Sequence, residues 1–157
     1  MPKPGPLLIE ALRSGTLASL AIMPLGWLFR ALDLRIGHYG PKFAALYMSD
    51  PQPAWLFAQH LLIGWVSALP LLWMLLRGLG AQRPLLTGAV YGAIYYVLVN
   101  SLILPLYFAD PLPWQLGWKT VAPSLLGHMA YGWVIALASR AFVARHGARP
   151  PLSLCKN

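Results

Sequence analysis

The sequence predicts an all-α fold, an integral membrane bundle of four helices built from two similar helical hairpins. Composition, the length of the apolar stretches and an internal repeat predict it. The 157-residue chain is 58% hydrophobic and only 10% charged, whereas soluble domains carry about 25% charged residues. So few charges cannot cover a water-exposed surface, and the length suits a single transmembrane domain over residues 1–157.

Four apolar stretches are long enough, or nearly so, for a membrane crossing of about 20 residues. Three reach that length without a charge, at about 54–76, 84–109 and 120–139. The first, at about 14–32, reaches it only if Arg30 extends its guanidinium to the membrane surface. Glu10 and Pro24 argue against a cleaved signal peptide, so we expect the N-terminal segment to be retained.

The basic residues predict the orientation, because an even number of spans puts both termini on one side. Eight fall on the side of the termini: Lys3, Arg13, Arg77, Arg83, Arg140, Arg145, Arg149 and Lys156. Four fall on the other side: Arg30, Arg35, Lys42 and Lys119. Basic loops stay inside the cell, so we expect a multi-pass protein of the bacterial inner membrane with both termini cytoplasmic.

The same distribution argues against nucleic acid as a partner. The formal net charge is +8, but the basic residues are spread over chain ends and loops, without the dense patch that a nucleic-acid groove needs. The predicted partner is therefore the lipid bilayer. A homodimer or a larger membrane complex is also compatible with the sequence.

An internal repeat divides the chain into halves at about 14–78 and 84–145. Residues 47–53 (YMSDPQP) recur as residues 107–113 (YFADPLP), and 60–69 (HLLIGWVSAL) recur as 128–137 (HMAYGWVIAL). The order is the same in both halves, which predicts two hairpins related by a pseudo-twofold axis along the membrane normal.

Each half also carries an aspartate directly before a proline. We expect the carboxylates of Asp50 and Asp110 to cap the helices that follow, since an aspartate accepts from free N–H groups and a proline fits the first helical turn. The alternative is a cation or proton site at the outer membrane surface.

His60, Asn100 and His128 are predicted to form a polar layer inside the membrane. Counted from the expected helix ends, they lie roughly 9 to 12 Å deep at 1.5 Å per residue. Polar groups at that depth must face the bundle interior and find partners.

Three interpretations of the histidine pair remain open. In the first, neutral imidazoles bond to Asn100, Ser67 or backbone carbonyls and stabilise helix packing by about 0.6 kcal/mol each, so that no cofactor is needed. In the second, His60 and His128 are the axial ligands of haem b, whose propionates meet Arg30, Arg35 or Lys119. The third is a proton relay or small transporter. A zinc site is disfavoured, because zinc takes three or four protein ligands.

The remaining motifs predict packing. Gly88 and Gly92 form a G-x-x-x-G pair, and Gly64 and Gly132 each lie one turn after a histidine, so neighbouring helices can approach closely there. Hydrolase and nucleotide-binding motifs are absent from the sequence. We therefore expect no enzyme, with no catalytic and no metal-binding residue.

Residues 127–134 (GHMAYGWV) resemble the His-x-x-Tyr-Gly element near the last helix of small bacterial inner-membrane proteins of unknown function, the YagU-like group. The resemblance implies a four-helix inner-membrane protein and adds no site residue. Taken together, the residues predict a non-enzymatic structural or accessory component of a membrane assembly.

Overall fold

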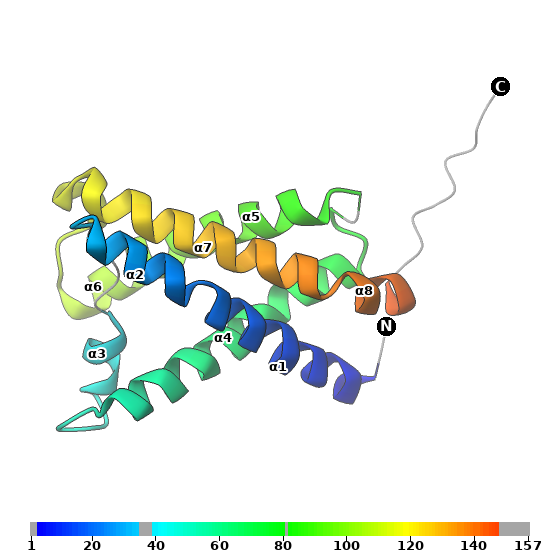
Figure 1. The fold of residues 1–157 in the computed structure, drawn as a ribbon, viewed down its shortest axis with the longest axis horizontal. Coiled ribbons are helices and arrows are strands. Elements are labelled where there is room, and N and C mark those ends of the chain that lie inside the picture. Colours follow the sequence, from blue (N-terminus) through cyan, green and yellow to red (C-terminus); the bar gives the residue numbers. More distant parts are fainter. Residues whose placement is uncertain (1–2, 35–38, 81, 148–157) are drawn as a thin grey trace.

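The computed structural model describes residues 3–34, 39–80 and 82–147. It confirms the predicted all-α fold with four apolar helices of membrane length: Pro4–Ala31, Pro53–Leu76, Pro84–Phe108 and Trp118–Ala138. Helix α1 begins at the end of the bundle where α8 (Arg140–His146) ends (Figure 1). We call this the terminal end, and the opposite end, which carries α3 (Tyr39–Ala44), the α3 end.

The first span begins earlier than predicted, at Pro4. Arg13 donates two hydrogen bonds to the carboxylate of Glu10, at 3.0 and 2.6 Å, so the two charges offset each other within α1 (Pro4–Ala21). Arg13 also donates to the carbonyl of Ala138 at 2.6 Å, where α7 (Trp118–Ala138) ends. This ion pair lets the helix extend to Pro4 and ties α1 to α7.

The first span is broken in the middle. Pro24 lies in the first turn of α2 (Met23–Ala31) and has no N–H for the helical ladder. Helix α1 packs against α4 (Pro53–Leu76), but beyond the break α2 runs away from α4 and contacts α7 (Figure 1). The two helices therefore diverge toward the α3 end.

Small residues form the crossing of α1 and α4. A Cβ atom added to Gly15 would lie 3.0 Å from the carbonyl oxygen of Gly64, and one added to Gly64 would collide with the hydroxyl of Ser19. Close backbone approach of this kind is typical of membrane helices, where packing rather than water exclusion drives association.

Glycines form the second crossing, between α5 (Pro84–Tyr95) and α7. A Cβ atom on Gly88 would collide with the carbonyl of Gly132, and one on Gly92 with the carbonyl of His128. Gly64, Gly88, Gly92 and Gly132 thus all lie at helix contacts.

The third span changes its geometry near its middle. It runs as α5, then a π-helical segment η1 (Tyr96–Ile103), then α6 (Leu104–Phe108). Pro105, the second residue after this segment, cannot donate an N–H to the carbonyl of Ser101, as an α-helix would require. A π-helix is wider, with bonds between residues five apart, so it changes the direction in which Asn100 points.

The predicted aspartate caps are wrong. Helix α4 begins at Pro53 with Gln52 as its N-cap, and the side chain of Gln52 donates to Asp50 at 2.7 Å. Asp110 pairs with the ammonium of Lys42 on α3 at 2.5 Å. Asp50 is too far from the first turn to cap it, and Asp110 meets a cation, which a carboxylate bonds more strongly than a neutral N–H.

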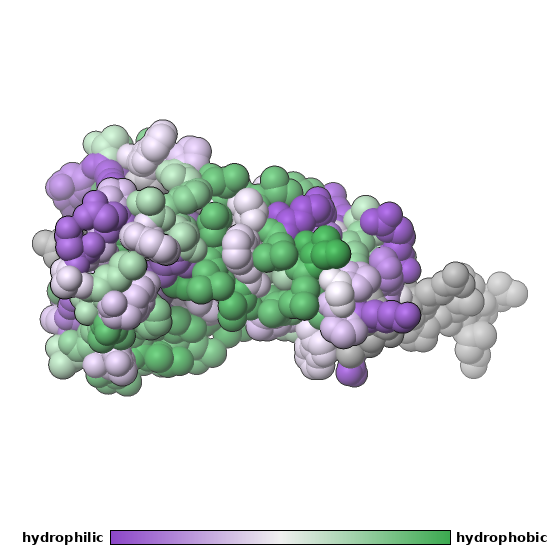
Figure 2. Space-filling model, turned by 90° about the horizontal axis from the view of Figure 1, so that it is seen from below, coloured by the Kyte–Doolittle hydropathy of each residue, from purple (hydrophilic) through white to green (hydrophobic). Residues whose placement is uncertain are grey.

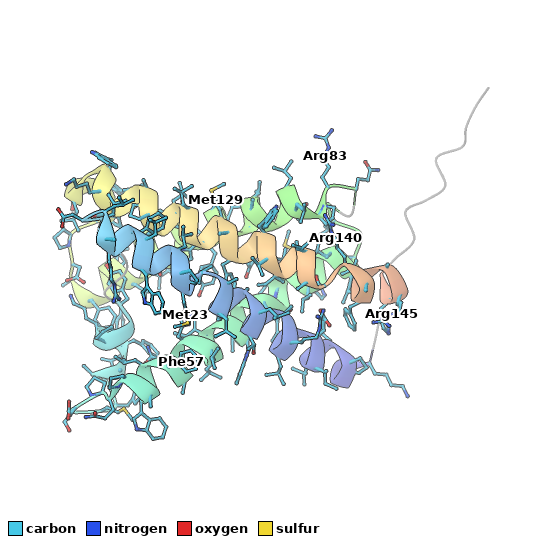
Figure 3. All side chains as sticks on the ribbon, viewed as in Figure 1. Met23, Phe57, Arg83, Met129, Arg140 and Arg145 are labelled. Atoms are coloured by element: carbon cyan, nitrogen blue, oxygen red, sulfur yellow. The ribbon has the colours of Figure 1, made fainter. Side chains whose placement is uncertain are left out.

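The surface has an apolar middle and polar ends. Figure 2 shows hydrophobic residues gathered midway along one face, with hydrophilic residues toward both ends. Arg83, Arg140 and Arg145 lie at the terminal end (Figure 3). Large apolar side chains are exposed along the spans, as a lipid-facing surface requires, for example Ile9, Trp27 and Leu106.

Candidate functional site

A cavity of about 610 Å³ lies where α2 and α4 diverge. Residues of α7 and η1 also line it, and α3 contributes residues at the α3 end. The described lining includes the cation of Arg30 but no aspartate or glutamate. The predicted layer meets here, because His60, Asn100 and His128 all line this cavity.

The cavity opens sideways between the helices. Trp27 of α2, Phe43 of α3 and Ile63 of α4 line it, and their side chains are 67%, 41% and 41% exposed. Side chains that belong to both the cavity wall and the outer surface mark its mouth. Arg30 also lines the cavity and is exposed, so the mouth combines apolar residues of α2 and α4 with this cation and with α3.

His128 is held by two hydrogen bonds. Its Nδ1 lies 2.6 Å from the carbonyl oxygen of Ser124, one turn earlier, and its Nε2 lies 2.5 Å from the amide nitrogen of Asn100. A carbonyl only accepts, so Nδ1 carries the hydrogen, and the lone pair of Nε2 accepts from the Asn100 amide. The rings of Tyr95 and Tyr96 lie 5.8 and 5.6 Å from the imidazole. Both ring nitrogens of His128 are thus engaged within the chain.

A second network joins α4 to α5 and α7. The hydroxyl of Tyr131 donates to the carbonyl of Gly64 and lies 3.2 Å from the hydroxyl of Ser67, which donates to Ile63 at 2.7 Å. Tyr91 donates to the carbonyl of Ser67 at 2.5 Å. Ser67 therefore bonds to Tyr131 and the backbone rather than to a histidine.

His60 and Ser19 differ from these groups. His60 lines the cavity, half-buried, and makes no hydrogen bond with the described part of the chain. Ser19 is completely buried and also lines the cavity, and its hydroxyl has no partner among residues 3–34, 39–80 and 82–147. The Ser19 hydroxyl lies against Gly64 at the α1–α4 crossing with almost no accessible surface, so only His60 is left as a polar group for a molecule in the cavity.

Helix α3 covers the α3 end of the cavity. Gln59 of α4 is buried, donates to the carbonyl of Gly40 at 2.9 Å and accepts from Tyr47. Burial, and then the charge of Asp110, raise the pKa of Tyr39, so this phenol stays neutral near physiological pH. The cover is therefore held by hydrogen bonds and by the ion pair of Lys42.

Sequence reasoning missed Ser19, Gln59 and Tyr131. Ser19 follows Gly15 by four residues, a small-x-x-x-small pattern that could have predicted its place at a helix contact. Nothing in the spacing of Tyr131 predicts that its hydroxyl reaches a carbonyl on α4. Over the described ranges, histidine, cysteine, aspartate and glutamate form no group of three or more suited to a metal ion.

Comparison with known proteins returned no family model, no curated protein and no solved structure that matches the chain.

Proposed function

We propose that this chain is a non-enzymatic accessory protein of a bacterial inner membrane that holds a lipid-soluble molecule between its helices. One observation carries the proposal: a cavity with a mostly apolar lining contains the half-buried His60, which has no hydrogen-bond partner in the described chain. Ligand sites of about 300–1,000 Å³ typically combine apolar walls with a few polar groups, and 610 Å³ lies within that range.

Binding accounts for the cavity better than catalysis does. His128 uses both ring nitrogens within the chain, and the Tyr131 hydroxyl is bonded to α4. Because the described lining contains no carboxylate, the free imidazole of His60 has no acid or base partner of that kind beside it.

The orientation we propose puts both termini in the cytoplasm. Six described basic residues belong to the terminal end: Lys3, Arg13, Arg77, Arg83, Arg140 and Arg145. The α3 end carries three described basic residues, Arg30, Lys42 and Lys119, and also the acidic Asp33, Asp50 and Asp110. The excess of positive charge at the terminal end supports a cytoplasmic location for it.

We also propose that the two halves are a structural repeat. The glycine one turn after each histidine, Gly64 or Gly132, lies at the helix crossing of its own half. The halves are not equivalent in their surroundings, since α1 packs against α7 while α5 barely contacts α4. A superposition of α4 on α7 in an experimental structure, by a twofold axis along the membrane normal, tests the repeat.

Haem b is the second candidate ligand, because His60 and His128 line one cavity. The hydrogen bonds do not fit it. An axial ligand must offer a ring lone pair to iron, and the lone pair of His128 already accepts from Asn100. If His128 bound iron through this lone pair, the side-chain amide of Asn100 would lose its hydrogen-bond partner inside the membrane.

A cavity-filling substitution tests the binding function. Met23 lines the cavity and points toward α4, whereas Met129 lies on the far side of α7 (Figure 3). We expect native mass spectra of the protein, released from mild detergent, to contain a small-molecule adduct. Met23→Trp should abolish the adduct, and the matched control Met129→Trp should keep it. Spectra without an adduct, or an adduct that both variants keep, would contradict the proposal.

A further inference from the structure

Arg30 is a cation without a matching anion in the described part of the chain. The two other described cations of the α3 end each have a carboxylate partner. Lys42 pairs with Asp110 at 2.5 Å, and Lys119 pairs with Asp33 at 3.6 Å. The side chain of Arg30 makes no ion pair or hydrogen bond with the described residues, and Arg30 is exposed and lines the cavity. A molecule in the cavity can therefore supply the missing negative charge.

The depth of the cavity matches one leaflet of a bilayer. On α4 its lining runs from Leu56, near the α3 end, to Ser67, eleven residues later, which is about 16 Å at 1.5 Å per residue. The first span lines the cavity over the same number of residues, from Ser19 to Arg30. The hydrocarbon core of a bilayer is about 30 Å thick, so one leaflet spans about 15 Å. An acyl chain that starts beside Arg30 can thus extend to the deep end of the cavity.

The walls between these two ends suit a hydrocarbon chain. Most of the described lining is apolar, with side chains such as Leu25, Leu56 and Val99, and it contains no carboxylate. Trp27 and Ile63 line the cavity and are exposed, so the gap between α2 and α4 is open toward the surroundings of the helices. A lipid can therefore place one chain in the cavity and leave a second chain in the bilayer.

We propose that the cavity binds one phospholipid of the leaflet at the α3 end, with the phosphate of an anionic head group at Arg30 and one acyl chain between the helices. This rests on the proposed binding function and specifies its ligand class. A guanidinium matches phosphate oxygens with a planar fork of N–H donors.

His60 favours a phospholipid over a free fatty acid. The half-buried imidazole lies on α4 between Leu56 and Ser67, and so between the two ends of the cavity. A phospholipid carries ester carbonyls between its phosphate and its chains, and an imidazole N–H can donate to such an acceptor. A fatty acid has only its carboxylate, which Arg30 would hold at the α3 end.

The test is a titration of the full chain in mild detergent with phosphatidylglycerol, and native mass spectra measure the first lipid bound. Arg30→Gln should weaken this binding about three- to tenfold, as the loss of a charge-assisted bond at an exposed site does. Lys119→Gln is the matched control, because it removes the same charge from the same end without touching the cavity lining. Arg30→Lys keeps the charge and should bind more tightly than Arg30→Gln. Met23→Trp fills the cavity and should block binding.

Parallel titrations with palmitate and with zwitterionic phosphatidylcholine separate this inference from the proposed function. If Met23→Trp blocks any of these lipids but phosphatidylglycerol binds equally to Arg30→Gln and Lys119→Gln, the inference is wrong and the binding function stands. Palmitate or phosphatidylcholine that binds as tightly as phosphatidylglycerol also overturns the inference. If Met23→Trp blocks none of the three lipids and the purified protein carries no adduct, both proposals fall.

Discussion

The side-chain amide of Asn100 donates a hydrogen bond to Nε2 of His128 across 2.5 Å, which joins the π-helical part of the third span to α7. It leaves His128 without a free lone pair. His60, which occupies the corresponding position in the other half of the sequence, keeps its ring free of hydrogen bonds to the described chain. The two histidines are thus alike in sequence and different in chemistry.

A double-mutant cycle on this bond should reveal coupling. Asn100→Leu and His128→Leu should each lower the free energy of unfolding by about 1 kcal/mol, since each leaves a polar group without its partner. The double variant should lose less than the sum, and unfolding in mixed micelles of dodecyl sulfate and maltoside measures this. Strictly additive losses would mean that the two side chains do not interact.

The crossing of α5 and α7 should not tolerate a side chain. Gly132→Ala should destabilise the bundle by about 1–3 kcal/mol, because the new methyl group would collide with the carbonyl of Gly88. Gly127→Ala on the same helix is the matched control, since a Cβ there meets nothing within 4 Å. Thermal unfolding in detergent compares the Gly132→Ala and Gly127→Ala variants. Equal unfolding midpoints for the two variants would argue against this crossing.

The purified protein should have no Soret band. Because the lone pair of His128 is occupied by Asn100, we expect the visible spectrum to be featureless and to stay so in His60→Ala and His128→Ala. An absorption spectrum of protein purified from haem-supplemented cells checks this. An intense Soret band that either substitution removes would establish the haem interpretation.

Cysteine labelling tests the proposed orientation. In a variant without Cys155, a cysteine at Gly80 should be protected from a membrane-impermeant thiol reagent applied outside, and one at Gln52 should react. Gly80 lies in the turn between α4 and α5, and Gln52 directly precedes α4 at the α3 end. The opposite labelling pattern would place the termini outside the cytoplasm.

Most of the span pattern could be predicted from the residues. The second, third and fourth spans agree with the structure within about two residues, because each apolar stretch is bounded by a charge or a proline. The first span was predicted too short, since Glu10 and Arg13 look like two charges in a sequence but form one ion pair in the fold. Contacts with an acceptor on another helix, such as that of Arg13 with Ala138, leave no local pattern.

The amino-acid order was sufficient for the class of fold and for the list of polar residues within the spans, because length, hydropathy and charge are local properties. The partners of those polar residues depended on packing between helices. The π-helical segment brings Asn100 to His128, and the break at Pro24 separates α2 from α4 and leaves His60 and Ser19 on a cavity wall. Such arrangements come from helix geometry and crossing angles over the whole bundle, which no single stretch of sequence encodes.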